Sequence, residues 1–124
     1  LFRSVAFTYP ATSDYTGHWV AILYTLDNNG KLVVEFFDPY GLSPDREFKF
    51  TNIKYNNKFS NILSKTNLPV TFNGYQLQEF GPHITTCGRH VVNRIRNRFM
   101  PLDEYAYRLL KTGDPDKYVL SLDL

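Results

Sequence analysis

Residues 17–41 read GHWVAILYTLDNNGKLVVEFFDPYG, and this stretch decides the fold. Two runs of apolar and β-prone side chains, 19–26 and 31–37, flank the sequence Asp-Asn-Asn-Gly, which is a strong signal for a tight turn. Pro39 ends the second run, because proline cannot donate a hydrogen bond within a central strand. The pattern therefore predicts a β-hairpin over residues 19–37.

The hairpin brings two chemically useful side chains to its open end. A turn centred between Asn28 and Asn29 places His18 opposite Pro39, one residue from Asp38. A one-residue offset is within the range of a four-residue turn or a bulge. A carboxylate beside an imidazole holds the ring in one tautomer and stabilises its protonated form. We therefore expect His18 and Asp38 to form an acid–base pair.

The single cysteine begins a second informative stretch, Thr86-Cys87-Gly88. A helix is expected over residues 87–99 with Thr86 as its N-cap, and the start of a helix favours thiolate over thiol. Cys87 is thus the candidate nucleophile, His18 the candidate base and Asp38 the group that orients it. This combination indicates a thiol hydrolase.

Two further histidines are rival bases. His83 precedes the cysteine, and His90 follows it by about one helical turn. No carboxylate lies close to His90 in sequence to orient its ring, so His18 is the stronger candidate.

Acyl transfer also needs hydrogen-bond donors for the developing oxyanion. The backbone N–H of Cys87 could supply one donor. The side-chain amide of Gln78 or of Gln76 could supply another, and strand alternation would put both on one face. Gln78 is preferred because it is nearer to the cysteine, and Gln76 remains the alternative.

The remaining pattern predicts an α+β domain. We expect strands at residues 4–9 and 69–78, helices at about 56–66 and 102–111, and an extended piece at 118–124. In the cysteine helix, the apolar residues that recur at helical spacing and are expected to face the core are Val91, Val92, Ile95 and Phe99.

Composition indicates one globular domain spanning residues 1–124. Hydrophobic residues make up 43% of the chain and charged residues 21%, which is ordinary for a soluble protein. No apolar run approaches the roughly 20 residues that span a bilayer, and no signal peptide is recognised. One cysteine favours a reducing, intracellular compartment over secretion. Neither a metal site nor a cofactor is expected.

Four arginines gather between positions 89 and 98, and the net charge of the chain is only +2. Arg94 and Arg98 are one helical turn apart and could together make weak contact with nucleic acid phosphates. The simpler interpretation is the solvated face of an amphipathic helix.

These motifs together resemble a known family. Gly-His18-Trp19-Val, Phe-Phe-Asp38-Pro-Tyr-Gly, Gln-Leu-Gln78 and Thr-Cys87-Gly are similar to the adenovirus-type maturation proteases and the related SUMO-specific protease superfamily. The nearest resemblance is to the versions in virophages, giant viruses and Maverick-type elements, and it covers roughly residues 15–100.

The resemblance implies a papain-like fold in circularly permuted order, with an antiparallel, hairpin-containing sheet packed on the helix that bears the cysteine. It implies His18 as general base, Asp38 as its orienting acid, Cys87 as nucleophile, a glutamine in the oxyanion hole, and Trp19 beside the imidazole. That family commonly places the glutamine six or seven residues before the cysteine, where this chain has Gly81 and Phe80.

The function implied is that of a monomeric viral cysteine endopeptidase that cleaves capsid and core precursors during virion maturation. Such an enzyme would act in the virion and in the cytoplasm or nucleus of the infected cell. A deubiquitinase or SUMO-like isopeptidase of the same superfamily is an alternative with the same chemistry. From another class, the chain could be a capsid- or DNA-binding module that uses the arginine-rich helix.

Overall fold

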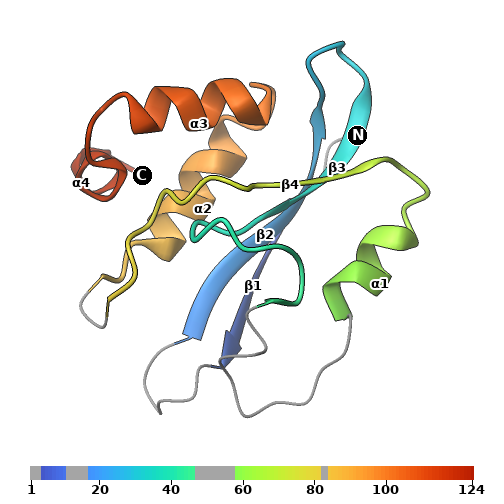
Figure 1. Cartoon of the computed structure of the whole chain (residues 1–124), viewed down its shortest axis with the longest axis horizontal. Coiled ribbons are helices and arrows are strands. Elements are labelled where there is room, and N and C mark those ends of the chain that lie inside the picture. Colours follow the sequence, from blue (N-terminus) through green and yellow to red (C-terminus); the bar gives the residue numbers. More distant parts are fainter. Residues whose placement is uncertain (1–3, 11–16, 47–57, 82–83) are drawn as a thin grey trace.

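The computed structural model describes residues 4–10, 17–46, 58–81 and 84–124, which form a mixed α+β fold (Figure 1). Four strands make one sheet in the order β1-β2-β3-β4, in which only the β3–β4 pair is parallel. The strands are β1 (Ser4–Pro10), β2 (Gly17–Leu26), β3 (Leu32–Phe37) and β4 (Val70–Phe72). The described helices are α1 (Lys58–Ser64), α2 (Cys87–Arg96), α3 (Leu102–Leu110) and α4 (Pro115–Ser121).

The sheet is covered on both faces, because successive residues of a strand point to opposite sides. Helix α2 packs directly on β2, with α3 and α4 on the same side, and α1 lies apart from them (Figure 1). The cluster on the α2 side contains Ala21, Leu23, Phe37, Leu77, Val91, Tyr105, Ala106, Leu109 and Val119. The cluster under α1 contains Val20, Val34, Phe36, Phe59 and Leu63.

The predicted hairpin is confirmed, with a register one residue away from the expected one. The ladder pairs Leu26 with Leu32 and ends at Ala21 with Phe37. The loop between the strands is closed by the N–H of Asp27, which donates to the Lys31 carbonyl at 2.8 Å. The loop is therefore longer by one residue than a turn centred between Asn28 and Asn29, and the extended register puts His18 opposite Tyr40.

Three other elements lie where the pattern placed them, with bounds that differ by one or two residues. β1 and α3 match the strand at 4–9 and the helix at 102–111. α1 matches the helix at 56–66 from residue 58 onward, and residues 56 and 57 lie outside the described residues.

The strand expected at 69–78 is wrong beyond Phe72. The Asn73 side chain ends it, because its oxygen accepts the Tyr75 N–H at 2.9 Å. Its amide donates to the Tyr75 carbonyl at 2.8 Å and to the Asp38 carbonyl at 2.7 Å. An asparagine that bonds to the backbone two residues on builds a turn in place of a ladder.

The extended piece expected at 118–124 is also wrong, because α4 occupies residues 115–121. Asp114 is its N-cap, accepting the Lys117 N–H at 3.1 Å, and Pro115 follows in the first turn. Both are ordinary helix-start signals. No helix in the described ranges has the length and apolar character needed to cross a membrane.

The core face of α2 differs from the predicted one. Val92 and Phe99 are exposed, and α2 ends at residue 96 rather than 99. The stripe that faces the sheet runs through positions 87, 90, 91 and 94, a helical spacing in which two members are His90 and Arg94. The buried face of α2 could not be predicted from apolar spacing alone, because His90 and Arg94 lie on it.

Arg94 is fully buried and forms a two-pronged ion pair with Glu35 of β3. Its Nε lies 2.9 Å from Oε2 and its Nη2 lies 2.8 Å from Oε1. Nη1 donates to the carbonyls of Asn97 at 3.0 Å and Met100 at 2.8 Å, and the guanidinium carbon lies 5.0 Å from the centre of the Tyr105 ring. The expectation that Arg94 and Arg98 bind phosphate together is therefore wrong, because Arg94 belongs to the core.

Breaking this pair should cost much more stability than breaking an exposed one. We expect Arg94→Met to lower the free energy of unfolding by about 3–5 kcal/mol, because Glu35 is left charged and buried without its partner. The exposed pair Arg108–Glu104, with an N–O distance of 3.1 Å, is the matched control. Arg108→Met should change stability by less than about 1 kcal/mol.

Urea unfolding measures both variants. The double variant Glu35→Leu/Arg94→Met should recover most of the loss, because it removes both buried charges. An Arg94→Met protein as stable as the Arg108→Met control would contradict this account of the core.

Candidate active site

His18 and Asp38 meet at the open end of the hairpin, as expected. His18 is the second residue of β2, and Asp38 directly follows β3. His18 Nε2 lies 2.8 Å from Asp38 Oδ1, and both side chains are buried. The Tyr40 N–H also donates to this oxygen at 2.8 Å. The carboxylate is therefore held by its own turn while it holds the imidazole.

Aromatic rings cover the imidazole. The Tyr40 ring stacks on His18 with centroids 4.4 Å apart and planes within 7° of parallel, and Phe80 stacks on Tyr40 at 4.6 Å. Gly41 has φ +79°, and a Cβ there would lie 2.8 Å from the Tyr75 carbonyl group, so only glycine fits this turn. The Pro-Tyr-Gly sequence after Asp38 thus places a ring on the histidine.

Cys87 is the first residue of α2 and is 9% exposed. The His18 side chain lies near the thiol and lowers its pKa. Nε2 of His18 faces Asp38, so Nδ1 is the nitrogen on the opposite side of the ring. Cysteine, histidine and aspartate are therefore brought together at one place, with the hydrogen bond between His18 and Asp38 already formed.

The surroundings of Cys87 favour its thiolate. Burial raises the pKa of the thiol, but hydrogen bonds from the His18 side chain and from the backbone at Trp19 and Gly88 outweigh it. The net pKa lies below that of an ordinary cysteine. This is the direction that a nucleophilic cysteine requires.

The Trp19 side chain lies next to Gly88, the residue after the nucleophile. The indole is partly exposed, and a Cβ added to Gly88 would lie 3.5 Å from its Cδ1 atom. The ring therefore packs against the first turn of α2, while the ring stacked on the imidazole is that of Tyr40. Tyr40 was not among the predicted site residues; with the observed register, its position opposite His18 could have indicated it.

The two glutamines differ in burial. Gln78 is 1% exposed, and its N–H donates to the Pro39 carbonyl at 2.9 Å, which ties it to the turn after Asp38. Gln76 is exposed. The two do not share a strand face as expected, because β4 ends at residue 72. Gln78 Nε2 donates to the Ile84 carbonyl at 3.2 Å, and its Oε1 has no protein partner among the described residues.

His90 has an orienting carboxylate after all. Its Nε2 lies 2.9 Å from Asp116 Oδ1, contributed by α4. Burial lowers the pKa of His90 despite the hydrogen bond to Asp116, so the ring is held neutral. His90 is fully buried, which makes it unsuited to exchange protons with a substrate. The third histidine, His83, lies outside the described residues.

Thr86 precedes α2 as expected but does not cap it with its side chain. Its hydroxyl donates to Asp116 Oδ1 instead. Asp116 was not predicted as a site residue, because it lies between the predicted helix at 102–111 and the predicted extended piece at 118–124 and has no motif of its own.

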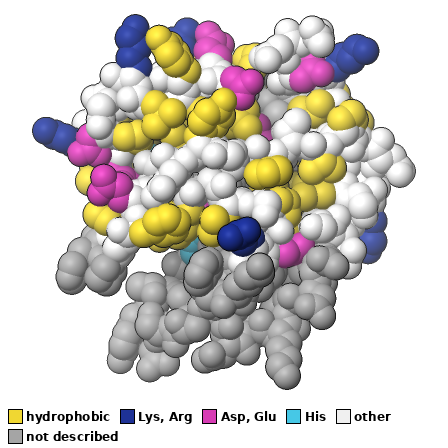
Figure 2. All heavy atoms as spheres, in the orientation of Figure 1, with side chains coloured by type: hydrophobic (Ala, Val, Ile, Leu, Met, Phe, Trp, Pro, Cys, Tyr) yellow, Lys and Arg dark blue, Asp and Glu magenta, His cyan; other side chains and the backbone are white. Residues whose placement is uncertain are grey.

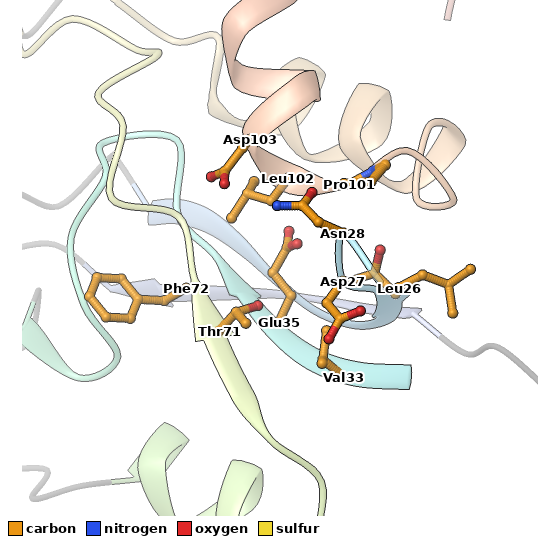
Figure 3. A pocket seen from close by; sticks show the side chains of 11 residues that line it. Leu26, Asp27, Asn28, Val33, Glu35, Thr71, Phe72, Pro101, Leu102 and Asp103 are labelled. Atoms are coloured by element: carbon orange, nitrogen blue, oxygen red, sulfur yellow. The ribbon is translucent and has the colours of Figure 1, made fainter. Parts of the chain in front are cut away.

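A concavity lies at the end of β2 away from His18, between the hairpin loop and the start of α3 (Figure 3). It has a volume of about 190 Å³ and is lined partly by Asp27, Asp103 and Glu35, the last of which is paired with Arg94. It is separate from the cysteine. In the described ranges, no group of three or more His, Cys, Asp or Glu side chains could hold a metal ion.

The arrangement contains the groups that nucleophilic acyl transfer requires. It supplies a thiol with a lowered pKa, a base near it, and a carboxylate that fixes the base. Among the described residues, histidine shows only a small area on the face seen in Figure 2, in keeping with the burial of His18 and His90.

Comparison with known proteins gives one distant relation. No family model matches the chain, and no solved structure matches it. Over 104 residues the chain is 29% identical to "Uncharacterized protein V9" of Sputnik virophage, an alignment that covers 78% of this chain and 57% of that protein. The chain thus spans a little over half the length of this relative and is similar to a virophage protein.

Proposed function

We propose that this chain is a cysteine protease that uses Cys87 as nucleophile, His18 as general acid and base, and Asp38 as the orienting acid. The observation that carries the proposal is the buried hydrogen bond between His18 and Asp38, together with the proximity of His18 to the Cys87 thiol, which lowers the pKa of that thiol. The three residues come from the start of α2 and from the adjoining ends of β2 and β3.

The chemistry follows from this order of contacts. The Cys87 thiolate attacks the peptide carbonyl carbon, and the C–N bond of the resulting tetrahedral intermediate then breaks. His18, protonated on Nδ1 by the thiol proton, gives that proton to the leaving amine. Water, deprotonated by the same nitrogen, then hydrolyses the thioester and regenerates the thiol. Asp38 keeps Nε2 protonated throughout and stabilises the imidazolium.

The oxyanion would be held by the N–H of Cys87 and the amide of Gln78. One hydrogen of Gln78 Nε2 goes to the Ile84 carbonyl. An amide nitrogen has two hydrogens, so one remains for the oxyanion in an orientation that Ile84 fixes. Gln76 is less suited, because its exposed amide donates to the Gln78 carbonyl at 3.2 Å.

We also propose that the fold is papain-like, in circularly permuted order. A cysteine at the start of a helix packed on the strand that carries the histidine is what a circularly permuted papain-like fold requires. The similarity to a virophage protein supports a viral setting. We therefore favour an endopeptidase that cleaves capsid and core precursors during virion maturation.

Labelling with a peptide-based electrophilic probe tests the nucleophile. We expect the probe to modify the protein at Cys87, the single cysteine, and His18→Gln to abolish the labelling because the thiolate loses its partner. His90→Gln is the comparison variant for the rival histidine, and it should keep most of the labelling because the glutamine amide can still donate a hydrogen bond to Asp116. Mass spectrometry maps the modified residue.

Labelling that survives His18→Gln and disappears in His90→Gln would assign the base to the other histidine. Equal labelling in all three proteins would mean that Cys87 is an ordinary thiol. Cleavage of virion precursors, set against ubiquitin-like and SUMO-like fusion proteins, then identifies the substrate class.

Replacing Gln78 should reduce turnover with little effect on the thiol. We expect Gln78→Ala to lower kcat by about 10²–10³, the usual cost of losing one oxyanion donor. Gln76→Ala is the control and should retain nearly full kcat. Steady-state kinetics on a cleaved peptide measures both, and the reverse ranking would move the oxyanion role to Gln76.

A further inference from the structure

The carboxylate of Asp116 joins three segments that surround the candidate nucleophile. Its Oδ1 accepts hydrogen bonds from the Thr86 hydroxyl and, at 2.9 Å, from His90 Nε2. Its Oδ2 accepts the Glu79 N–H at 2.9 Å. Asp116 itself lies in the first turn of α4 and is buried.

Each of these donors is next to a residue that the proposed reaction uses. Thr86 directly precedes Cys87, and His90 lies one helical turn after it on α2. Glu79 directly follows Gln78, the proposed oxyanion donor. The Asp116 carboxylate is therefore hydrogen-bonded to a residue before Cys87 and to a residue after it in the sequence. It is also hydrogen-bonded to the main chain next to Gln78.

Hydrogen bonds stabilise the ionised form of the Asp116 side chain. Burial raises the pKa of this carboxyl, but hydrogen bonds from Thr86, Glu79 and His90 outweigh it and hold the pKa below its usual range. The carboxylate is thus ionised at neutral pH and accepts all three hydrogen bonds at once. Hydrogen bonds to an ionised acceptor are the stronger kind.

Docking of α4 does not by itself require this cluster. Arg89 of α2 also binds the C-terminal end of α4. Its Nε donates to the Val119 carbonyl at 2.8 Å, and its Nη2 donates to the carbonyl of Leu122, the C-cap residue. These two contacts join the same pair of helices without involving Thr86, His90 or Glu79. The Asp116 contacts differ in that they end on the neighbours of Cys87 and Gln78.

We propose that Asp116 is a positioning residue of the active site, which holds Cys87 against His18 and Gln78 in front of the sulfur. The inference rests on the proposed function. Misplacement of reacting groups by about 1 Å can cost 10²-fold in rate, so a clamp on both groups affects catalysis as well as stability.

The test compares Asp116→Ala with Arg89→Met, which loosens α4 without touching the neighbours of Cys87. For each protein kcat and KM are measured on a cleaved peptide, together with the alkylation rate of Cys87 by iodoacetamide at mildly acidic pH and the melting temperature. We expect Asp116→Ala to lower kcat by about 10²-fold at nearly constant KM and to slow alkylation. Arg89→Met should lower the melting temperature while kcat and alkylation of the folded protein stay near wild type.

Thr86 provides a milder pair that keeps the test valid if Asp116→Ala does not fold. Thr86→Val removes the hydroxyl at nearly constant volume and should reduce both kcat and alkylation, whereas Thr86→Ser restores the donor and should restore both. Wild-type rates in Thr86→Val, or equal losses of kcat in Asp116→Ala and Arg89→Met at equal loss of stability, would overturn the positioning role. An ordinary alkylation rate for Cys87 in the wild-type protein would instead refute the proposed function itself.

Discussion

The register between β2 and β3 is the constraint on which the rest of the structure depends. It ends at the pair Ala21–Phe37, and just beyond that pair His18 and Asp38 come within hydrogen-bond distance. Side chains alternate along a strand, so a slip of one residue would turn His18 and its neighbours to the opposite face. The same slip would exchange the residues packed under α2 with those packed under α1. Both apolar clusters therefore enforce the register that assembles the candidate site.

Polar groups buried beneath α2 also help to fix the position of Cys87. Arg94 is paired with Glu35 of β3, and His90 is paired with Asp116 of α4. Apolar contacts between α2 and the sheet would persist if the helix shifted slightly along its axis. The directional hydrogen bonds of Arg94 and His90 form only when α2 has one position relative to β3 and α4. A buried ion pair such as Arg94–Glu35 adds little net stability, and its best-attested use is to specify one arrangement. Here that arrangement brings the first residue of α2, Cys87, to the end of the hairpin where His18 lies.

Sequence patterns predicted the local features well and the distant polar contacts poorly. The hairpin, α3 and the meeting of His18 with Asp38 follow from apolar runs, turn residues and strand geometry, all of which are short-range signals. Arg94 and Asp116 were missed because a charged side chain gives no sign, in a single sequence, of a buried partner 59 or 26 residues away. The early end of β4 and the helix α4 had local signals in Asn73 and in Asp114-Pro115, which apolar periodicity outweighed. The position of Tyr40 opposite His18 depends on the length of the hairpin loop, which the turn sequence predicts only to within one residue.

The central claim is that contact with His18 turns Cys87 into a nucleophile, and a direct titration of the thiolate tests it. Cys87 is the single cysteine, so the ultraviolet absorbance of thiolate reports on this group alone. We predict that the pKa of the Cys87 thiol lies below that of a free cysteine measured in the same buffer. In His18→Ala the pKa should rise to that value or above, because burial of the sulfur remains while the contact that lowers the pKa is gone. A wild-type pKa at or above that of free cysteine, unchanged in His18→Ala, would contradict the claim.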